Sequence, residues 1–583
     1  MKSNGVRGAV VGLSIAVWLA SGAWLAAKEP AQKTAADLLP ESTIAYIEIP
    51  KPAEWIALLI DHPLRSKLEA TPDYQKALQG KEYKAFRIAL EMAEETLGTK
   101  WRPGLESLLE GGIYVGHDRT TKKGVVLIRS RDVELRNRLR DVLFNLARTA
   151  NPNAIQDRKY RELQGYRLDK LIMAEVGPWL VLTDAPELAK EVADNYLDAD
   201  RKSLAGKEHF QKAYGAKNSK SAWAWVDLEA ARSEGLGRKL TQEKSDNPVG
   251  ELLLGGAVPA LGKASFATAG MSLDSESARL EFTIPFEAGW VTGPRKFFFR
   301  PASESPPMVL TPQRTIFSLA TYRDLAGWWL AKEDLYKEEV VAEMAKAETG
   351  IATLFGGRDF GQDVLGALKP QWQFVVARQD FNSPKRLTPA IKLPAFAFVS
   401  KLKDPAKSQR QMKITFQSVV GFLNVIGGMN GAPQLELSDK TIGKAKLATT
   451  SYGAEDAERV KNDIFYNFSP SIVVIDDWFI VCSASPLAEE LAEQLNAGKA
   501  TQLAGSDFET KLHVGVLGDI LADNKSQLIA QNMLEKGHDR AAADREISLL
   551  LKIVEALRDV RVSFGAESDR LKLEAELRVK GKE

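Results

Sequence analysis

The sequence predicts an α+β protein made of two homologous modules, each a mainly antiparallel sheet with packed helices. Three observations predict this class. One stretch of the 583-residue chain is written twice, its apolar strands come in hairpin pairs, and a helical pattern follows each hairpin. A doubly wound parallel sheet is disfavoured, because its strands would be joined by helices and not by short turns.

The repeated stretch runs from Gly177 to Leu197 and again from Asp476 to Asn496. Aligned residues are 299 positions apart without a gap, as in Trp179 with Trp478. The same spacing relates the Leu-Ala-Gly triplets at 204–206 and 503–505. A register kept over this length indicates duplication.

Each copy predicts a hairpin followed by a helix that lies back on the sheet. The first strands are expected at 171–175 and 472–475, and the second strands at 179–183 and 478–482, where nearly every residue is apolar. Turn dipeptides separate them. Asp184 with Glu187 resembles a capping box, and Ser485 before Pro486 resembles an N-cap with proline at the first helical position.

Looser repeats extend the two halves. Both open on a proline-containing segment before a short strand, at 39–46 and 311–318, and then on a tryptophan-bearing helix. Long helices are expected at 133–149 and 405–426. Both halves end on alternating strands, at 278–284 and 570–577. The stretch from Gly289 to Pro307 has the glycine and proline content of a linker, with an aromatic cluster at 297–299 that should pack on a domain.

The expected organisation is therefore a signal peptide or membrane anchor over residues 1–27, a first α+β module over 34–290, and a second over 306–583 that repeats the first. Lys2 and Arg7 precede an uncharged, mostly apolar run from Ala9 to Ala27, which is typical of an export signal. The run is also long enough to span a bilayer if it is not cleaved. A lipid-anchored lipoprotein is excluded, because no cysteine lies near this segment.

Charge and cysteine content limit the function. The chain has 78 basic and 77 acidic residues, whereas a nucleic-acid-binding protein carries a basic excess. Its one cysteine, Cys482, cannot form an internal disulfide and lies in an apolar strand, which favours a buried structural role.

The order of these segments resembles that of large exported bacterial proteins catalogued as a domain of unknown function, with duplicated α+β modules. The resemblance is carried by the export signal, the Leu-Pro-x-x-Thr opening at 39–43, the acidic leucine-rich turn at 362–368, and the hairpin that leads into an alanine-rich helix. It implies export and duplication, and it implies no catalytic residue.

Local motifs predict no catalytic, cofactor-binding or metal-ligating residue. The five histidines, His62, His117, His209, His513 and His538, show no metal-site spacing. No Gly-x-Ser-x-Gly motif is present. In the glycine-rich stretch 255–265, Ala257 and Ala264 occupy positions that a phosphate-binding loop reserves for other residues, so a turn after a helix is expected.

Two further groups have alternative interpretations. Asp476 and Asp477 could form a carboxylate pair, but a solvated turn is the simpler interpretation. Trp223 and Trp225 share one strand face and could stack on a ligand, but such residues more often belong to a core.

The preferred hypothesis is an exported, non-catalytic cell-envelope protein, periplasmic or on the extracytoplasmic face of the membrane, that binds an unknown ligand or an envelope protein. A cleft between the modules is where a ligand is expected. The alternative is an extracytoplasmic hydrolase whose active site converges only in three dimensions. A third possibility, an assembly factor tethered to the inner membrane, depends on whether residues 9–27 are retained.

Overall fold

The structure is a computed structural model that describes residues 33–580, except 62–64, 66–68, 70–71, 219, 239–242, 383–387, 454–463 and 504. The predicted signal or anchor, Ala9 to Ala27, lies outside the described residues, as do His62 and Ala504.

The fold is α+β, as predicted, with one large antiparallel sheet and packed helices. The strands of the first half are β1 (Thr43–Ile49), β2 (Ile113–Asp118), β3 (Lys123–Arg129), β4 (Gln156–Tyr160), β5 (Leu163–Leu168), β6 (Leu171–Val176), β7 (Trp179–Thr183), β8 (Ala222–Asp227), β9 (Phe266–Leu273) and β10 (Ser277–Pro285). Those of the second half are β12 (Thr315–Tyr322), β13 (Leu368–Ala377), β14 (Ala395–Leu402), β15 (Leu435–Ile442), β16 (Ala445–Tyr452), β17 (Ser471–Ile475), β18 (Trp478–Cys482), β20 (Phe508–His513), β21 (Leu557–Ala566) and β22 (Arg570–Val579). The two short strands β11 (Met308–Val309) and β19 (Thr501–Gln502) pair apart from the large sheet.

Helices connect these strands in both halves. The helices of the first half are α2 (Ala35–Leu38), α3 (Pro52–Asp61), α5 (Pro72–Leu78), α6 (Lys81–Leu97), α7 (Trp101–Leu109), α8 (Val133–Ala150), α9 (Pro186–Leu197), α10 (Glu208–Gly215), α11 (Leu228–Ser233), α13 (Pro248–Leu254) and α14 (Ala257–Lys263). Those of the second half are α15 (Leu325–Leu330), α16 (Lys332–Leu335), α17 (Glu338–Leu354), α18 (Pro405–Met429), α20 (Ser485–Asn496), α21 (Val514–Asp523), α22 (Lys525–Lys536) and α23 (Arg540–Ala556).

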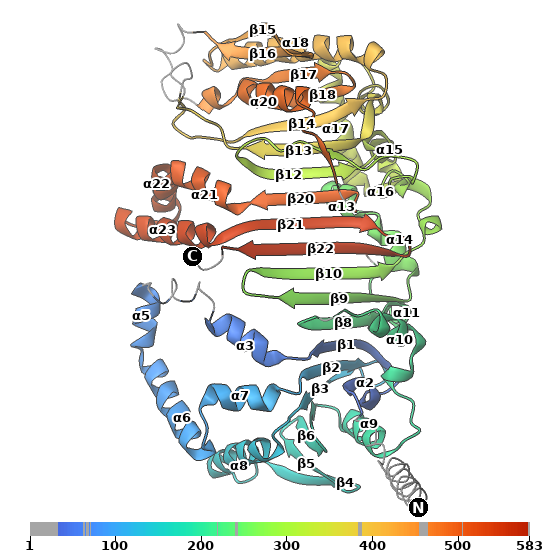
Figure 1. Cartoon of the computed structure of the whole chain (residues 1–583), viewed down its shortest axis with the longest axis vertical. Coiled ribbons are helices and arrows are strands. Elements are labelled where there is room, and N and C mark those ends of the chain that lie inside the picture. Colours follow the sequence, from blue (N-terminus) through green and yellow to red (C-terminus); the bar gives the residue numbers. More distant parts are fainter. Residues whose placement is uncertain are drawn as a thin grey trace, which may run out of the picture.

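Twenty described strands form the large sheet, and Figure 1 shows them stacked along the long axis of the molecule. Their pairing order from one edge to the other is β4, β5, β6, β7, β3, β2, β1, β8, β9, β10, β22, β21, β20, β12, β13, β14, β18, β17, β16, β15. The edge strands β4 and β15 both carry exposed charged side chains, which opposes edge-to-edge association.

The second half repeats the pairing pattern of the first. Each ladder among β1 to β10 has a counterpart among β12 to β22 that joins strands in the same chain order. The registers correspond as well. Val125 lies opposite Thr183 in the β3–β7 ladder, and Ala397 lies opposite Cys482 in the β14–β18 ladder. Ala397 comes 272 positions after Val125, and Cys482 comes 299 positions after Thr183. An irregularity also recurs at one place, at Thr43 in β1 and at Thr315 in β12.

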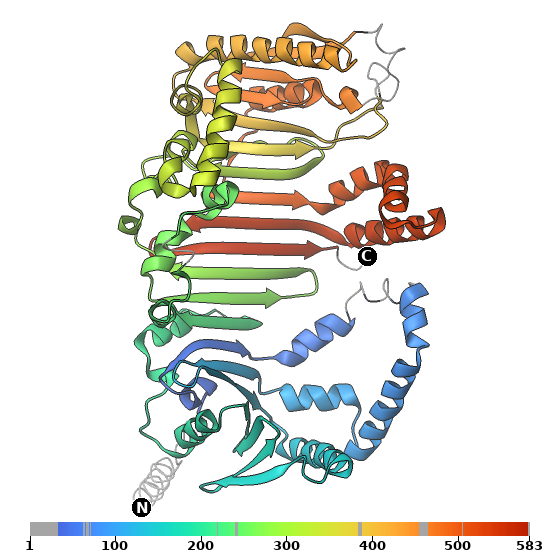
Figure 2. The ribbon, with the colours of Figure 1, turned by 180° about the vertical axis from the view of Figure 1, so that it is seen from behind.

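The two sheet halves join where β10 pairs with β22, which we call the seam (Figures 1 and 2). Glu281 lies opposite Glu574 there, and the two residues are 293 positions apart. The same spacing relates Arg279 to Lys572, and each of these cations contacts the other strand's glutamate: Arg279 Nε lies 3.5 Å from Glu574 and Lys572 Nζ 3.4 Å from Glu281. These two ion pairs are therefore related by an approximate two-fold axis, whereas the pair of Arg279 with Glu576 at 2.9 Å has no counterpart, because Thr283 stands at the equivalent position.

Each end of the sheet is covered by helices on both faces. In the first half, α9 packs Leu188 and Val192 into the core that contains Trp179, while α8 packs Phe144 against Tyr166 and Met173 on the other face. The second half has the same layers. There α20 covers one face with Leu487 and Leu491, and α18 covers the other with Phe416 and Val420.

Three local expectations were wrong. The cap of α9 is Ala185, and Asp184 instead forms an ion pair with Lys123 at 2.6 Å. The cap of α20 is Ala484, so Ser485 is already the first helical residue and its hydroxyl bonds to backbone carbonyls. The glycine-rich stretch forms a second helix, α14, because Gly255 and Gly256 continue the chain with helical dihedral angles.

The seam makes stability depend on pH. Burial of Glu576 opposes its ionisation, but hydrogen bonds from Arg279 and Arg578 lower the pKa of this carboxyl below its ordinary value. A lowered pKa stabilises the fold above the unfolded-state pKa, and that contribution is lost as pH falls through the folded-state pKa. We therefore expect Glu576→Gln to lower the free energy of unfolding near neutral pH and to have a smaller effect as pH falls below the ordinary carboxyl pKa of 4.5.

Urea unfolding at a series of pH values measures this difference. Glu436→Gln, which changes an exposed carboxylate on the edge strand β15, is the matched control and should change stability little at any pH. An effect of Glu576→Gln that stays constant with pH would contradict the assignment.

Candidate functional site

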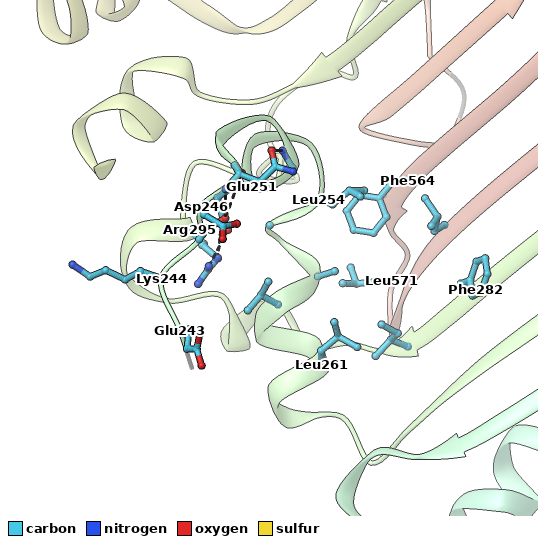
Figure 3. A pocket seen from close by; sticks show the side chains of 18 of the residues that line it. Glu243, Lys244, Asp246, Glu251, Leu254, Leu261, Phe282, Arg295, Phe564 and Leu571 are labelled. Atoms are coloured by element: carbon cyan, nitrogen blue, oxygen red, sulfur yellow. Dashed lines mark hydrogen bonds and ion pairs between the residues drawn. The ribbon is translucent and has the colours of Figure 1, made fainter. Parts of the chain in front are cut away.

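A cavity lies at the seam, between the sheet and helices α13 and α14. Its volume is about 600 Å³. Figure 3 shows apolar side chains, among them Phe564, Leu571 and Leu261, on one side, and the charged groups Asp246, Glu251 and Arg295 on the other. We call it the seam cavity.

The sheet supplies an apolar floor from three adjacent strands. Phe282 of β10 lies opposite Leu573 of β22, which in turn lies opposite Phe564 of β21. Ile284 lies opposite Leu571 on the same face. Because side chains alternate along a strand, the ion-paired residues Arg279, Glu281 and Glu574 occupy the other face of the seam.

Helices α13 and α14 form the facing wall. Asn247 caps α13 by accepting a hydrogen bond from the amide of Gly250 at 2.9 Å, and Pro248 takes the first helical position. Gly256 lies against the ring of Phe298, where an added Cβ would come within 2.2 Å of a ring carbon. This close approach holds α14 near the linker and turns Val258 and Leu261 toward the cavity.

The polar side of the cavity consists of opposite-charge pairs. Buried Glu251 accepts two hydrogen bonds from Arg295, from Nε at 2.6 Å and from a terminal nitrogen at 3.0 Å. Lys337 contacts Asp246 at 3.1 Å and lowers the pKa of that carboxyl. Two of the three carboxylates that line the cavity, Glu251 and Asp246, are thus each paired with a cation, and the exposed Glu243 and Lys244 lie at its edge.

Arg323 ties this wall to the second half of the chain. Its side chain, 1% exposed, donates hydrogen bonds to the carbonyls of Leu252, Leu253, Phe298 and Tyr322 at 2.5 to 3.1 Å and stacks over the Phe298 ring at 3.5 Å. Burial lowers the pKa of Arg323 to about 9, so the group stays cationic at neutral pH. The hydrogen bonds offset the cost of burying that charge.

The arrangement suits binding of an apolar group. The residues lining the seam cavity include no histidine or cysteine, and its carboxylates Glu251 and Asp246 are each held by a cation. Acid–base or nucleophilic catalysis needs a reactive group with an adjacent base or acid. No group of three or more His, Cys, Asp or Glu residues suited to a metal occurs in the described part of the chain.

The residues weighed from sequence lie elsewhere. His117, His209, His513 and His538 belong to separate parts of the chain: β2, α10, β20 and the segment after α22. Cys482 is buried, and burial raises the pKa of its thiol. Trp223 and Trp225 are core residues, 5% and 0% exposed, which agrees with the simpler interpretation.

Asp476 and Asp477 form the β17–β18 turn, in which Asp476 is exposed as the simpler interpretation expected and Asp477 is partly buried. Burial of Asp477 would raise its pKa, yet Lys369 at 2.9 Å and Lys401 at 3.4 Å hold that pKa below its ordinary value. The aspartate thus neutralises lysines and does not pair with Asp476.

Sequence reasoning missed the residues of the seam cavity, although it expected a cleft between the halves. A signal was present in the alternation of Phe282 and Ile284 in β10 with Leu571 and Leu573 in β22, which marks a half-exposed apolar face on each.

No protein-family model matches the chain, and no curated protein sequence matches it. Three crystal forms of TP0453 are similar in structure. Form IV has a TM-score of 0.24 and 7% identity over 43% of this chain and 79% of that chain. Form III has a TM-score of 0.25 and 8% identity, and form I has 0.23 and 9%, each over 44% of this chain and 80% of that chain. Similarity at this level does not establish a common fold. Among the described helices, none combines the length and the apolar character needed to cross a membrane.

Loss of Arg323 should loosen the wall of the seam cavity. Arg323→Leu leaves four carbonyls without this donor, so we expect the free energy of unfolding to fall by about 3 kcal/mol or more. Arg323→Lys should be intermediate, because an ammonium cannot reproduce the planar donors. Urea unfolding measures both. Arg87→Leu, which removes an exposed ion pair on α6, should cost less than about 1 kcal/mol. Equal effects at the two arginines would contradict this role.

Proposed function

We propose that the protein is an exported, non-catalytic binding protein of the cell envelope, made of two copies of one α+β module, which holds an apolar part of its ligand in the seam cavity. The modules span residues 34–290 and 306–583. The observation that carries the proposal is the seam cavity, because its lining comes from both halves and its carboxylates Glu251 and Asp246 are each paired with a cation.

The strand ladders support the duplication. Each ladder of the first half has a counterpart in the second, and the spacing of 299 found in the sequence relates the registers of the two tryptophan hairpins: Val176 lies opposite Trp179, and Ile475 lies opposite Trp478. The cores correspond too, since Trp179 and Leu188 share one cluster with Val192, and their equivalents Trp478, Leu487 and Leu491 share another.

Binding is favoured over hydrolysis by the electrostatics of the cavity. A hydrolase needs ionisable groups that converge on one reacting atom. In the seam cavity, Glu251 and Asp246 each face their own cation, while the opposite side offers Phe282, Phe564 and Leu571 for an apolar ligand.

The export pattern of residues 1–27 supports a periplasmic location or attachment to the extracytoplasmic face of the membrane through residues 9–27. A ligand of the envelope or another envelope protein would be the partner, and the near-zero net charge argues against nucleic acid.

The proposal is tested by filling the cavity. N-phenyl-1-naphthylamine, an uncharged apolar fluorophore, should bind the purified full chain saturably with a rise in emission. Val258→Trp places a large ring in the cavity from the α14 wall and should weaken binding about tenfold or more. Val249→Trp is the matched control, because Val249 is 65% exposed on neighbouring α13 and does not line the cavity. Equal affinity in all three proteins, or no saturable binding, would count against the proposal.

A further inference from the structure

A second cavity, separate from the seam, lies in the first half between strands β4 to β6 and helix α9. Its volume is about 310 Å³. We call it the α9 cavity. Leu163, Ile172 and Ala174 of the sheet and Ala189 and Ala193 of the helix give it an apolar interior.

The opening of the α9 cavity is basic. The exposed lining residues Arg158, Lys159, Arg167 and Lys190 are all cations, and no acidic residue lines the cavity. The guanidinium of Arg158 bonds to Gln156 and that of Arg167 to a backbone carbonyl. Within the described residues, none of these four cations forms an ion pair with a carboxylate. An apolar space under unpaired cations is complementary to an amphipathic anion.

In the second half, a leucine side chain fills the equivalent space. Gly165 lies opposite Ala174, and at the equivalent place Leu447, 3% exposed, lies opposite Val473. The leucine side chain thus occupies the position that Gly165 leaves empty.

Charge at the opening differs in the same way. Lys440, opposite Leu447, forms an ion pair with Glu489 of α20 at 2.9 Å, which links the hairpin to the helix. The equivalent residues in the first half are Arg158, opposite Gly165, and Lys190 of α9, both cations. The second half therefore fills this space with the Leu447 side chain and the Glu489 carboxylate, whereas the first half has no equivalent of either group.

We propose that the α9 cavity binds an amphipathic anion, an alkyl or acyl chain that ends in a carboxylate or phosphate. The chain takes the place that Leu447 fills in the second half, and the anion lies between Arg158 and Lys190, where the second half has Glu489. The inference rests on the module equivalence proposed above and is independent of ligand binding at the seam.

Calorimetric titration of the purified full chain tests it with four probes. Decanoate and decyl phosphate carry both parts of the ligand and distinguish a carboxylate from a phosphate head group, decanol carries the chain alone, and acetate carries the anion alone. At least one of the two amphipathic anions should bind about tenfold or more tightly than decanol, as the loss of a charge-assisted hydrogen bond implies, and acetate should not bind detectably.

Two variants introduce the residue types of Leu447 and Glu489 at the equivalent positions of the first half. Gly165→Leu fills the cavity, and its Cβ meets no atom closer than 3.4 Å, so the strand can accept it. Lys190→Glu supplies a carboxylate to Arg158 at an exposed site and keeps the test valid if Gly165→Leu does not fold. Each should weaken binding of the amphipathic anion about tenfold or more. Lys407→Glu, a charge reversal on the exposed surface of α18, is the matched control and should have no effect.

Absence of saturable binding of decanoate and decyl phosphate to the unaltered chain would overturn the proposal, and so would decanol binding of equal strength. Binding unaffected by both variants, or lost in Val258→Trp instead, would assign the anion to the seam cavity and would also overturn it.

Discussion

The pairing of β10 with β22 is the constraint on which the rest of the structure depends. Nine residue pairs, from Ser277 with Arg578 to Pro285 with Arg570, turn two ten-stranded sheets into one. The ladder is antiparallel and its centre falls on Glu281 and Glu574, so the last strand of the first half pairs with the last strand of the second half. The alternation of side chains then places ion pairs on one face and an apolar floor on the other, and the seam cavity forms where α13 and α14 cover that floor.

The sequence predicted the local units well and their assembly less well. The hairpins that contain Trp179 and Trp478, with their trailing helices, were predictable because turn, strand and helix signals lie within about twenty residues of each other. The seam was not predictable, because β10 and β22 are almost 300 residues apart and an alternating pattern does not indicate which strand it pairs with. Helix α14 was missed because Gly255 and Gly256 resemble a turn in the sequence, which does not show that Phe298 packs against Gly256.

The difference between Gly165 and Leu447 was hidden for a related reason. These strands are 282 positions apart, whereas the hairpins that follow are 299 apart, so an ungapped alignment does not bring the two residues together. Only the ladders reveal that a glycine and two cations in one half correspond to a leucine and an ion pair in the other. The two halves therefore share their ladders at this place and differ in the side chains beside it.

The continuous sheet also has a mechanical consequence. Nineteen ladders at roughly 4.8 Å each give a path of roughly 90 Å from β4 to β15. Tension applied between these edges would act on the ladders in series, so the sheet could bear no more force than its weakest ladder. The β16–β17 ladder is a weak one, because it has only three residue pairs, from Lys446 to Ala448. Under such tension, the β16–β17 ladder would therefore separate while the nine-pair ladder between β10 and β22 remained intact.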